Sequence, residues 1–184
     1  MTVAAARDHI ARQVEELQRQ VYDLRRQIAS GVELEALPEG ELDVLRCRVG
    51  DNQTAFLQES VEEVVMMARL TPVPEAPSWA PGLLNLRGTM APVVDVVARI
   101  GREVRRPALS DRIVVCSIDG RRVGLIVQEV LGVDRCETAD VEPPPQDMPC
   151  APYLLGVLHG DGTPIMLLSV ACLVATSDLP DNGA

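Results

Sequence analysis

The side chains that could carry out covalent or acid–base chemistry form two small sets in this sequence. Cys136 or Cys150 could act as a nucleophile with His159 as its base. Glu62 and Glu63 could provide a pair of acid–base carboxylates. No catalytic motif surrounds either set, and successive residues of a strand point to opposite faces, so Glu62 and Glu63 would not converge on one substrate. We therefore expect a protein that is not an enzyme and holds no cofactor.

The cysteines and histidines do not have the spacing of a metal site. The only histidines are His9 and His159, whereas zinc requires clustered ligands. The five cysteines are an odd number at wide spacing, without a C-x-x-C pair: Cys47, Cys116, Cys136, Cys150 and Cys172. Most of them lie within apolar runs, where a thiol behaves as a small buried hydrophobe. We expect structural thiols rather than disulfides or metal ligands.

The composition excludes several classes of protein. Of the 184 residues 47% are hydrophobic but only 2% are aromatic, which argues against an aromatic cage or a base-stacking surface. All 17 basic residues are arginine, so no lysine can form a Schiff base or a P-loop contact. The net charge is −10, and no segment is basic enough to bind nucleic acid.

The apolar stretches do not predict membrane insertion. The longest one, residues 164–175, is too short to cross a bilayer. The first residues lack the charged and apolar regions of a signal peptide. We expect a cytoplasmic protein.

The elements that would position these side chains begin with a helix over residues 1–30. Apolar residues recur there with heptad spacing, at Ile10, Val14, Leu17, Val21, Leu24 and Ile28. β-branched residues at one core position and mostly leucine at the other favour a parallel pair of helices. The same stripe would also suit docking on another protein's helix, or packing against the chain's own globular domain. All three alternatives stay open.

The rest of the chain has the pattern of a mainly β domain over residues 43–175, after an acidic linker at 31–42 and before a tail at 176–184. Short apolar or β-branched runs predict strands at 44–49, 54–57, 61–67, 83–86, 91–94, 113–118, 123–127 and 165–168. Asp119-Gly120 and Asp161-Gly162 are hairpin turn signals. Two short helices are expected, at 95–100 and 169–175. This arrangement favours a barrel or a sandwich.

Residues 70–95 carry a long motif, P-x-x-P-x-x-x-x-G-x-x-N-L-R-G-x-x-x-P-V-V-D. It is formed by Pro74, Pro77, Gly82, Asn85, Leu86, Arg87, Gly88, Pro92, Val93, Val94 and Asp95. It resembles the central signature of the chemotaxis coupling family, the CheW-like domains. The order of the other strands is similar to that family over about residues 43–175. Two departures stand out: Gln128 occupies a place where the family commonly has an acid, and residues 96–98 carry no charge.

The resemblance implies a fold and a role. The fold would be two small five-stranded β-barrels packed on a shared hydrophobic seam, preceded by the N-terminal α-helix with coiled-coil heptads. The role would be that of a non-enzymatic adaptor, which docks on the regulatory domain of a CheA-type histidine kinase and on the cytoplasmic hairpin tips of chemoreceptors. Such docking requires an apolar groove rather than reactive groups.

The resemblance also implies a receptor-binding groove. Its residues would be Glu63, Val64, Met66, Leu83, Leu84, Asn85, Arg87 and Gly88. Arg87 has two interpretations of equal weight, an internal pair with Glu63 or a fork of donors presented to the receptor. Because Met66 and Met67 are adjacent in a strand with one buried face, one of them is a candidate for the groove.

The kinase contact is predicted only by region. The hairpin at 113–127 and the turn at 160–163 are the candidates, because homologous barrels would pair through an apolar patch with a polar rim. A second hypothesis is that the chain is a scaffold that recruits a motility or polar-localisation partner through its N-terminal helix without engaging the kinase. A weak homodimer through residues 10–28 is compatible with either hypothesis.

Overall fold

The computed structural model describes residues 37–101, 105–118, 120–145, 147–160 and 162–174. The predicted heptad helix at 1–30, the first half of the predicted linker (31–36) and the tail at 176–184 lie outside the described residues. Of the described helices, none is long and apolar enough to cross a membrane.

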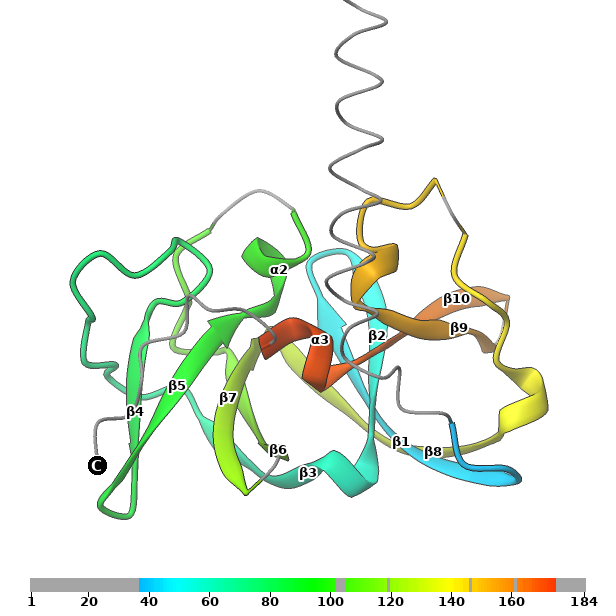
Figure 1. Ribbon diagram of the computed structural model, residues 1–184, viewed down its shortest axis with the longest axis horizontal. Coiled ribbons are helices and arrows are strands. Elements are labelled where there is room, and N and C mark those ends of the chain that lie inside the picture. The colour runs from blue at the N-terminus through cyan, green and yellow to red at the C-terminus, as the bar shows by residue number, and fades with distance from the viewer. Residues whose placement is uncertain (1–36, 102–104, 119, 146, 161, 175–184) are drawn as a thin grey trace, which may run out of the picture.

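Two five-stranded sheets lie side by side (Figure 1). The first has the strand order β8-β1-β2-β10-β9, and the second has the order β3-β6-β7-β5-β4. The first sheet consists of β1 (Glu41–Val49), β2 (Asn52–Leu57), β8 (Glu129–Glu137), β9 (Leu154–Gly160) and β10 (Thr163–Leu168). The second consists of β3 (Val61–Met66), β4 (Gly82–Leu86), β5 (Thr89–Asp95), β6 (Arg112–Ile118) and β7 (Arg121–Val127).

The two sheets have the same internal topology. In each sheet a hairpin, β1–β2 or β6–β7, is joined by a parallel pairing to one strand of a second hairpin. A fifth strand, β8 or β3, pairs antiparallel with the first hairpin and carries a register shift at the matching place. The chain is therefore built from two equivalent repeats, β1–β5 and β6–β10, that exchange strands, so each sheet contains strands of both repeats. This repeat was not predicted from the sequence.

The expected closed barrels are not present, because the described strand pairings leave both sheets open. The segment after β3 reaches β4 through one isolated bridge, Thr71–Leu83, and the segment after β8 reaches β9 through Glu142–Val157. In both places the bridging residue is followed at once by a proline, Pro72 or Pro143. Proline has no N–H to donate, so pairing stops after one residue and the barrel does not close.

Apolar side chains form three clusters. One lies within each sheet's own fold, around Leu57 and Leu167 in the first and around Val93 and Ile113 in the second. Each sheet, with the helices and loops that adjoin it, forms one half of the molecule. The third and largest cluster lies between these two halves and contains residues from both sheets, with Phe56 fully buried in it. Burial of this layer joins the two halves by apolar contact.

Three segments between the strands are short 3₁₀ turns: η1 (Gln58–Ser60), η2 (Thr138–Asp140) and η3 (Ala151–Tyr153). The two predicted short helices are present as α2 (Val96–Arg99) and α3 (Val170–Val174). Each has a side-chain N-cap: Asp95 accepts a hydrogen bond from the Ala98 N–H, and Ser169 accepts one from the Cys172 N–H. Figure 1 shows α3 between the two sheets, where it contacts β6.

Two strands, β8 and β9, were not predicted from the sequence. Both lie at an edge of the first sheet. The hairpins predicted from the turn signals at 119–120 and 161–162 are present, because β6, which ends at Ile118, pairs antiparallel with β7, and β9, which ends at Gly160, pairs antiparallel with β10.

Candidate partner-binding site

The β4–β5 turn holds the motif residues Asn85 to Gly88. Leu86 pairs with Thr89, so Arg87 and Gly88 form a two-residue turn, and both have positive φ, 53° and 93°. Positive φ at both central residues is the type I′ geometry that suits the twist of a hairpin. The Asn85 side-chain carbonyl accepts a hydrogen bond from the Gly88 N–H at 2.7 Å, which fixes the turn. Arg87 is therefore presented at a well-defined hairpin tip.

Arg87 and Glu63 form the predicted ion pair. The distance between Arg87 Nη2 and Glu63 Oε2 is 3.1 Å. Glu63 belongs to β3, at the opposite edge of the sheet from β4, so this contact connects the two edges. The Arg87 side chain is 84% exposed, which leaves most of its guanidinium accessible to a partner. Both expected roles, internal pairing and partner contact, are compatible with this geometry.

Successive residues of strand β3 alternate between a solvent-exposed face and a partly buried face. Val64 and Met66 are 40% and 70% exposed, while Met67, the next residue, packs partly buried against the core of the second sheet. The two methionines therefore point in opposite directions, as expected, and Met66 is the one that faces solvent. Glu62 and Glu63 also diverge, because Glu62 pairs with Arg122 at 2.7 Å instead of joining the Arg87 contact.

The predicted groove residues on strand β4 differ in their exposure to solvent. Leu83 is half-buried and Asn85 is exposed. Leu84 is only 4% exposed and belongs to the core of the second sheet, so a docked protein would not reach its side chain. The predicted set thus occupies an outer face of β3 (Val64, Met66), an outer face of β4 (Leu83, Asn85) and the hairpin tip with its anchor Glu63.

A groove lies at the junction of the two halves, with a volume of about 780 Å³. Both sheets line it, and its apolar residues are Val64 from β3, Val130 from β8 and Ala108 from the loop that precedes β6. Its charged residues are Arg48, Asp51, Arg105, Asp111, Arg112 and Glu129. A groove lined by charges of both signs together with a few apolar side chains is suited to binding a protein surface.

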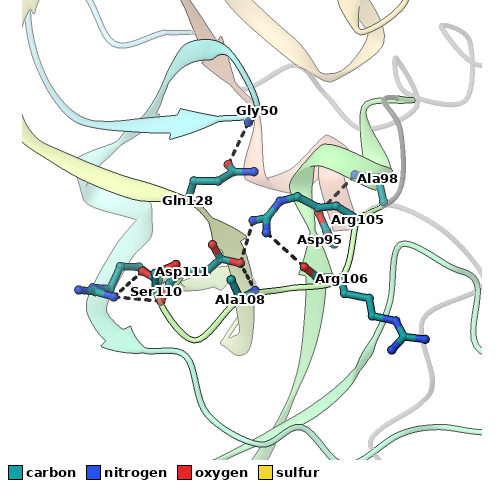
Figure 2. Close-up of polar contacts among 10 residues, drawn as sticks. Gly50, Asp95, Ala98, Arg105, Arg106, Ala108, Ser110, Asp111 and Gln128 are labelled. Atoms are coloured by element: carbon teal, nitrogen blue, oxygen red, sulfur yellow. Dashed lines mark hydrogen bonds and ion pairs between the residues drawn. The ribbon is translucent and has the colours of Figure 1, made fainter.

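The loop at 105–111 forms one wall of this groove and is held by a buried carboxylate (Figure 2). Asp111 is 2% exposed, and its Oδ2 accepts hydrogen bonds from Ala108 N at 2.7 Å and Arg105 Nη2 at 2.8 Å. At the tip, Leu109 is 84% exposed. These residues were not predicted as part of a site from the sequence, although Pro107 before Ser110-Asp111 is a turn signal.

Gln128, the departure from the family acid, connects the halves at the β7–β8 crossing. Its backbone N–H donates to the Arg48 carbonyl at 3.0 Å, and its side-chain carbonyl accepts from the Gly50 N–H at 2.9 Å. Figure 2 shows this side chain reaching the β1–β2 turn. A carboxylate could accept the same hydrogen bond, so the departure preserves the contact.

The titratable groups of the described residues form no reactive centre. Burial raises the pKa of the Asp95 carboxyl, which is engaged as the N-cap of α2. Burial raises the pKa of the Cys47 thiol and of the Cys116 thiol to about 12, so both stay protonated at neutral pH. His159 Nε2 lies 3.1 Å from Glu142 Oε2, an exposed pair.

The five cysteines, all described, form no disulfide. No group of three or more His, Cys, Asp or Glu side chains within the described ranges is arranged to hold a metal ion. The arrangement offers contact surfaces rather than reactive groups.

Comparison with known proteins identifies the family of this chain. A model of the CheW-like domain matches residues 43–178. Chemotaxis protein CheW of Rhizobium meliloti is 33% identical over 109 residues, which cover 59% of this chain and 70% of that protein. Protein FrzA of Myxococcus xanthus is 33% identical over 146 residues, covering 78% and 90%. The crystal structure of scaffolding protein TtCheW from Thermoanaerobacter tengcongensis matches with a TM-score of 0.70 at 26% identity, covering 79% of this chain and 97% of that one.

Fold, surface and sequence together define a non-enzymatic scaffold of the chemotaxis coupling type. The chain belongs to the CheW-like domain family. The resemblance inferred from the 70–95 motif is thereby confirmed, as is the expectation that the protein is not an enzyme.

Proposed function

We propose that this protein couples the hairpin tips of chemoreceptors to a CheA-type histidine kinase in cytoplasmic signalling arrays. The observation that carries the proposal is the exposed apolar face of β3, where Met66 is 70% and Val64 40% exposed beside a groove lined by both halves. Large apolar side chains that remain exposed in this way mark contact surfaces. Methionine suits a helical partner because its flexible side chain adapts to different shapes.

The receptor contact would combine this face with the hairpin tip. Val64, Met66, Leu83 and Asn85 supply apolar and polar contacts, and Arg87 with Gly88 supplies the tip. Glu63 anchors Arg87, and Leu84 supports the strand from the core. An arginine held by one carboxylate retains donors for a second partner, which favours the dual role.

The kinase contact would use the exposed ends of the hairpin at 113–127 and the turn at 160–163. The strands of that hairpin are mostly buried, and Arg121 and Arg122 at the start of β7 are exposed. In the turn, Gly162 and Thr163 are exposed. These accessible ends, rather than the strand interiors, are therefore the surfaces to examine by cross-linking.

A titration of the full chain with receptor-tip peptides and with the kinase regulatory domain tests the proposal. Leu83→Glu and Met66→Glu should weaken receptor-tip binding several-fold, because each places a charge on the apolar face. Arg121→Ala, at an exposed end of β7, is the matched control for the receptor and should bind normally. Equal losses for all three variants would contradict the receptor assignment.

The N-terminal residues 10–28 would provide oligomerisation or partner docking. If the full chain binds neither kinase nor receptor tip at high micromolar concentration, the scaffold hypothesis is favoured, in which those residues recruit a motility or polar-localisation partner. The FrzA relative of Myxococcus xanthus, which does not carry the CheW name, is the reason to keep this second function in view.

A further inference from the structure

Arg99 crosses from one half of the molecule to the other. It lies at the end of α2, which follows β5 of the second sheet. Its Nε donates a hydrogen bond to the carbonyl of Leu173 in α3, at 2.9 Å. Its guanidinium carbon lies 4.2 Å from the centre of the Trp79 ring and 5.2 Å from that of Tyr153. A single side chain thus contacts both halves through a hydrogen bond and two aromatic faces.

The surroundings of Arg99 are equivalent in the two halves. The Asp95 N–H donates to the Trp79 carbonyl at 2.7 Å, and the Ser169 N–H donates to the Tyr153 carbonyl at 2.8 Å. Asp95 and Ser169 are also the N-caps of α2 and α3. The spacing from each cap back to its aromatic residue is the same in both halves.

Leu173 follows Ser169 at the same distance as Arg99 follows Asp95. The arginine therefore binds the backbone of its own structural counterpart. In the half that contains the first sheet this position is Leu173, whose apolar side chain is fully buried in the cluster between the sheets. The polar connection is consequently made from one side only, by Arg99.

This contact has a directional geometry that the apolar layer lacks. The residues around it, among them Val97, Val170 and Leu173, belong to the apolar cluster between the halves, and apolar attraction has no preferred direction of its own. A planar guanidinium stacked on aromatic rings, with one N–H directed at a carbonyl, is satisfied only over a narrow range of angles. Like the Gln128–Gly50 hydrogen bond at the β7–β8 crossing, the Arg99 contact is a polar connection between the two halves.

We propose that Arg99 is a positioning residue that sets the relative orientation of the two sheets, and thereby the shape of the partner-binding groove. The groove takes Arg48, Asp51 and Val130 from the first sheet and Val64 and Arg112 from the second, so a rotation between sheets changes its width. The consequence for binding rests on the proposed function, whereas the orientation itself does not.

The test uses the full chain and three variants. Arg99→Met keeps the length of the side chain but removes the charge and the hydrogen bond. Arg99→Lys retains a cation next to the rings. Arg122→Met is the matched control, because Arg122 pairs with Glu62 within one sheet. Residual dipolar couplings of backbone amides are fitted separately for each sheet, which reports their relative orientation irrespective of stability.

The expected result is a changed orientation between the sheets in Arg99→Met, with each sheet internally unchanged. Arg99→Lys and Arg122→Met should keep the wild-type orientation. Receptor-tip affinity should fall about 2- to 30-fold in Arg99→Met and recover largely in Arg99→Lys, as expected for a residue that modulates a site without touching the ligand. An unchanged orientation in Arg99→Met would overturn the proposal.

Two further outcomes separate this inference from the proposed function. A rotated but equally tight-binding Arg99→Met variant would refute the connection between orientation and the groove. If the wild-type chain binds no receptor tip, the proposed function fails, whereas a rotation in Arg99→Met would still support the positioning role.

Discussion

Arg105 and Asp111 close the base of the loop beside the groove, with Arg105 Nη2 2.8 Å from Asp111 Oδ2. The Asp111 carboxylate is buried, whereas about a third of the Arg105 side chain is exposed. The backbone of the loop is also held by the Asp111 N–H, which donates to the Ala108 carbonyl at 3.0 Å. Leu109 at the tip is therefore displayed on a fixed frame and is not part of a freely varying segment.

Replacing Asp111 should loosen this frame and lower stability. Asp111→Ala removes the acceptor of the Ala108 N–H and of the Arg105 guanidinium, which should reduce the free energy of unfolding by about 2 kcal/mol. Asp111→Asn retains one acceptor oxygen and should cost less. Urea denaturation measures both values, and Ser110→Ala, at an exposed neighbouring position, should be near neutral. A neutral Asp111→Ala would contradict the role of the carboxylate.

Removing Arg87 should affect binding more than stability. Its ion pair with Glu63 is exposed on the arginine side, and exposed pairs contribute about 0–1 kcal/mol. Arg87→Ala should therefore change the free energy of unfolding by less than about 1 kcal/mol, while weakening receptor-tip binding several-fold. Calorimetric melting and binding titrations at matched folded fraction separate the two effects. A large loss of stability with unchanged affinity would assign Arg87 to the structure alone.

Gly156 should not tolerate a methyl group. A Cβ at this position in β9 would collide with the Val141 side chain and the Glu142 carbonyl, which bridges to Val157. Gly156→Ala should reduce the free energy of unfolding by about 1–3 kcal/mol through overpacking. In the control Gly160→Ala the added methyl meets mainly the flexible end of Ile165, so the loss should be smaller. The reverse order in chemical denaturation would refute the close approach at Gly156.

Several strands could be predicted from local apolar runs, although β9, which is mostly buried, was missed. The runs in β6 and β7 are apolar and flank a turn signal, so local pattern sufficed. In contrast, β8 is polar and exposed over much of its length, and it is stabilised next to β1 by cross-strand ion pairs such as Arg46–Asp134 at 2.7 Å and Arg135–Asp43 at 2.8 Å. These pairs are recognisable only when β1 is already alongside.

The candidate site could be predicted only in part, because some of its features depend on contacts between distant segments. Asn85 to Gly88, which form the turn that presents Arg87, belong to a motif of fixed spacing, and the pairing of Arg87 with Glu63 was expected from the family resemblance. The burial of Leu84 depends on which face of β4 meets the core, and a run of apolar residues does not specify that. The Arg99 contact depends on the packing of two distant segments, so no local pattern reveals it.

Stability should fall at high pH because of two buried thiols. Folding raises the pKa of Cys47 and Cys116 from 9.0 to about 12, so their contribution is fully present below pH 9 and is lost as the pH rises from 9 toward 12. The loss should approach about 1.4 kcal/mol per thiol for each pH unit in that window. Denaturation curves between pH 8 and pH 11 measure it.

The double variant Cys47→Ala with Cys116→Ala isolates the contribution of these thiols. Its stability is expected to be lower at neutral pH, because two buried side chains are shortened, but its dependence on pH above 9 should be shallower than that of the wild type. Identical slopes for both proteins would show that these thiols do not ionise on unfolding in this range.

The heptad residues 10–28, which lie outside the described residues, are expected to mediate weak self-association. Each apolar seam residue contributes about 1.5–3 kcal/mol when fully buried, but the ordering of a short helix offsets much of this gain. We expect a dimer of micromolar affinity, abolished in the double variant Val21→Asp with Leu24→Asp because two charges would enter the apolar seam. Tyr22→Asp, which lies outside the seam in the heptad register, is the control and should still dimerise. Sedimentation equilibrium of the full chain decides the matter: a wild type that stays monomeric at tens of micromolar would reject self-association and leave cis packing or docking on a different helix, and a lower melting temperature of the double variant would then favour cis packing.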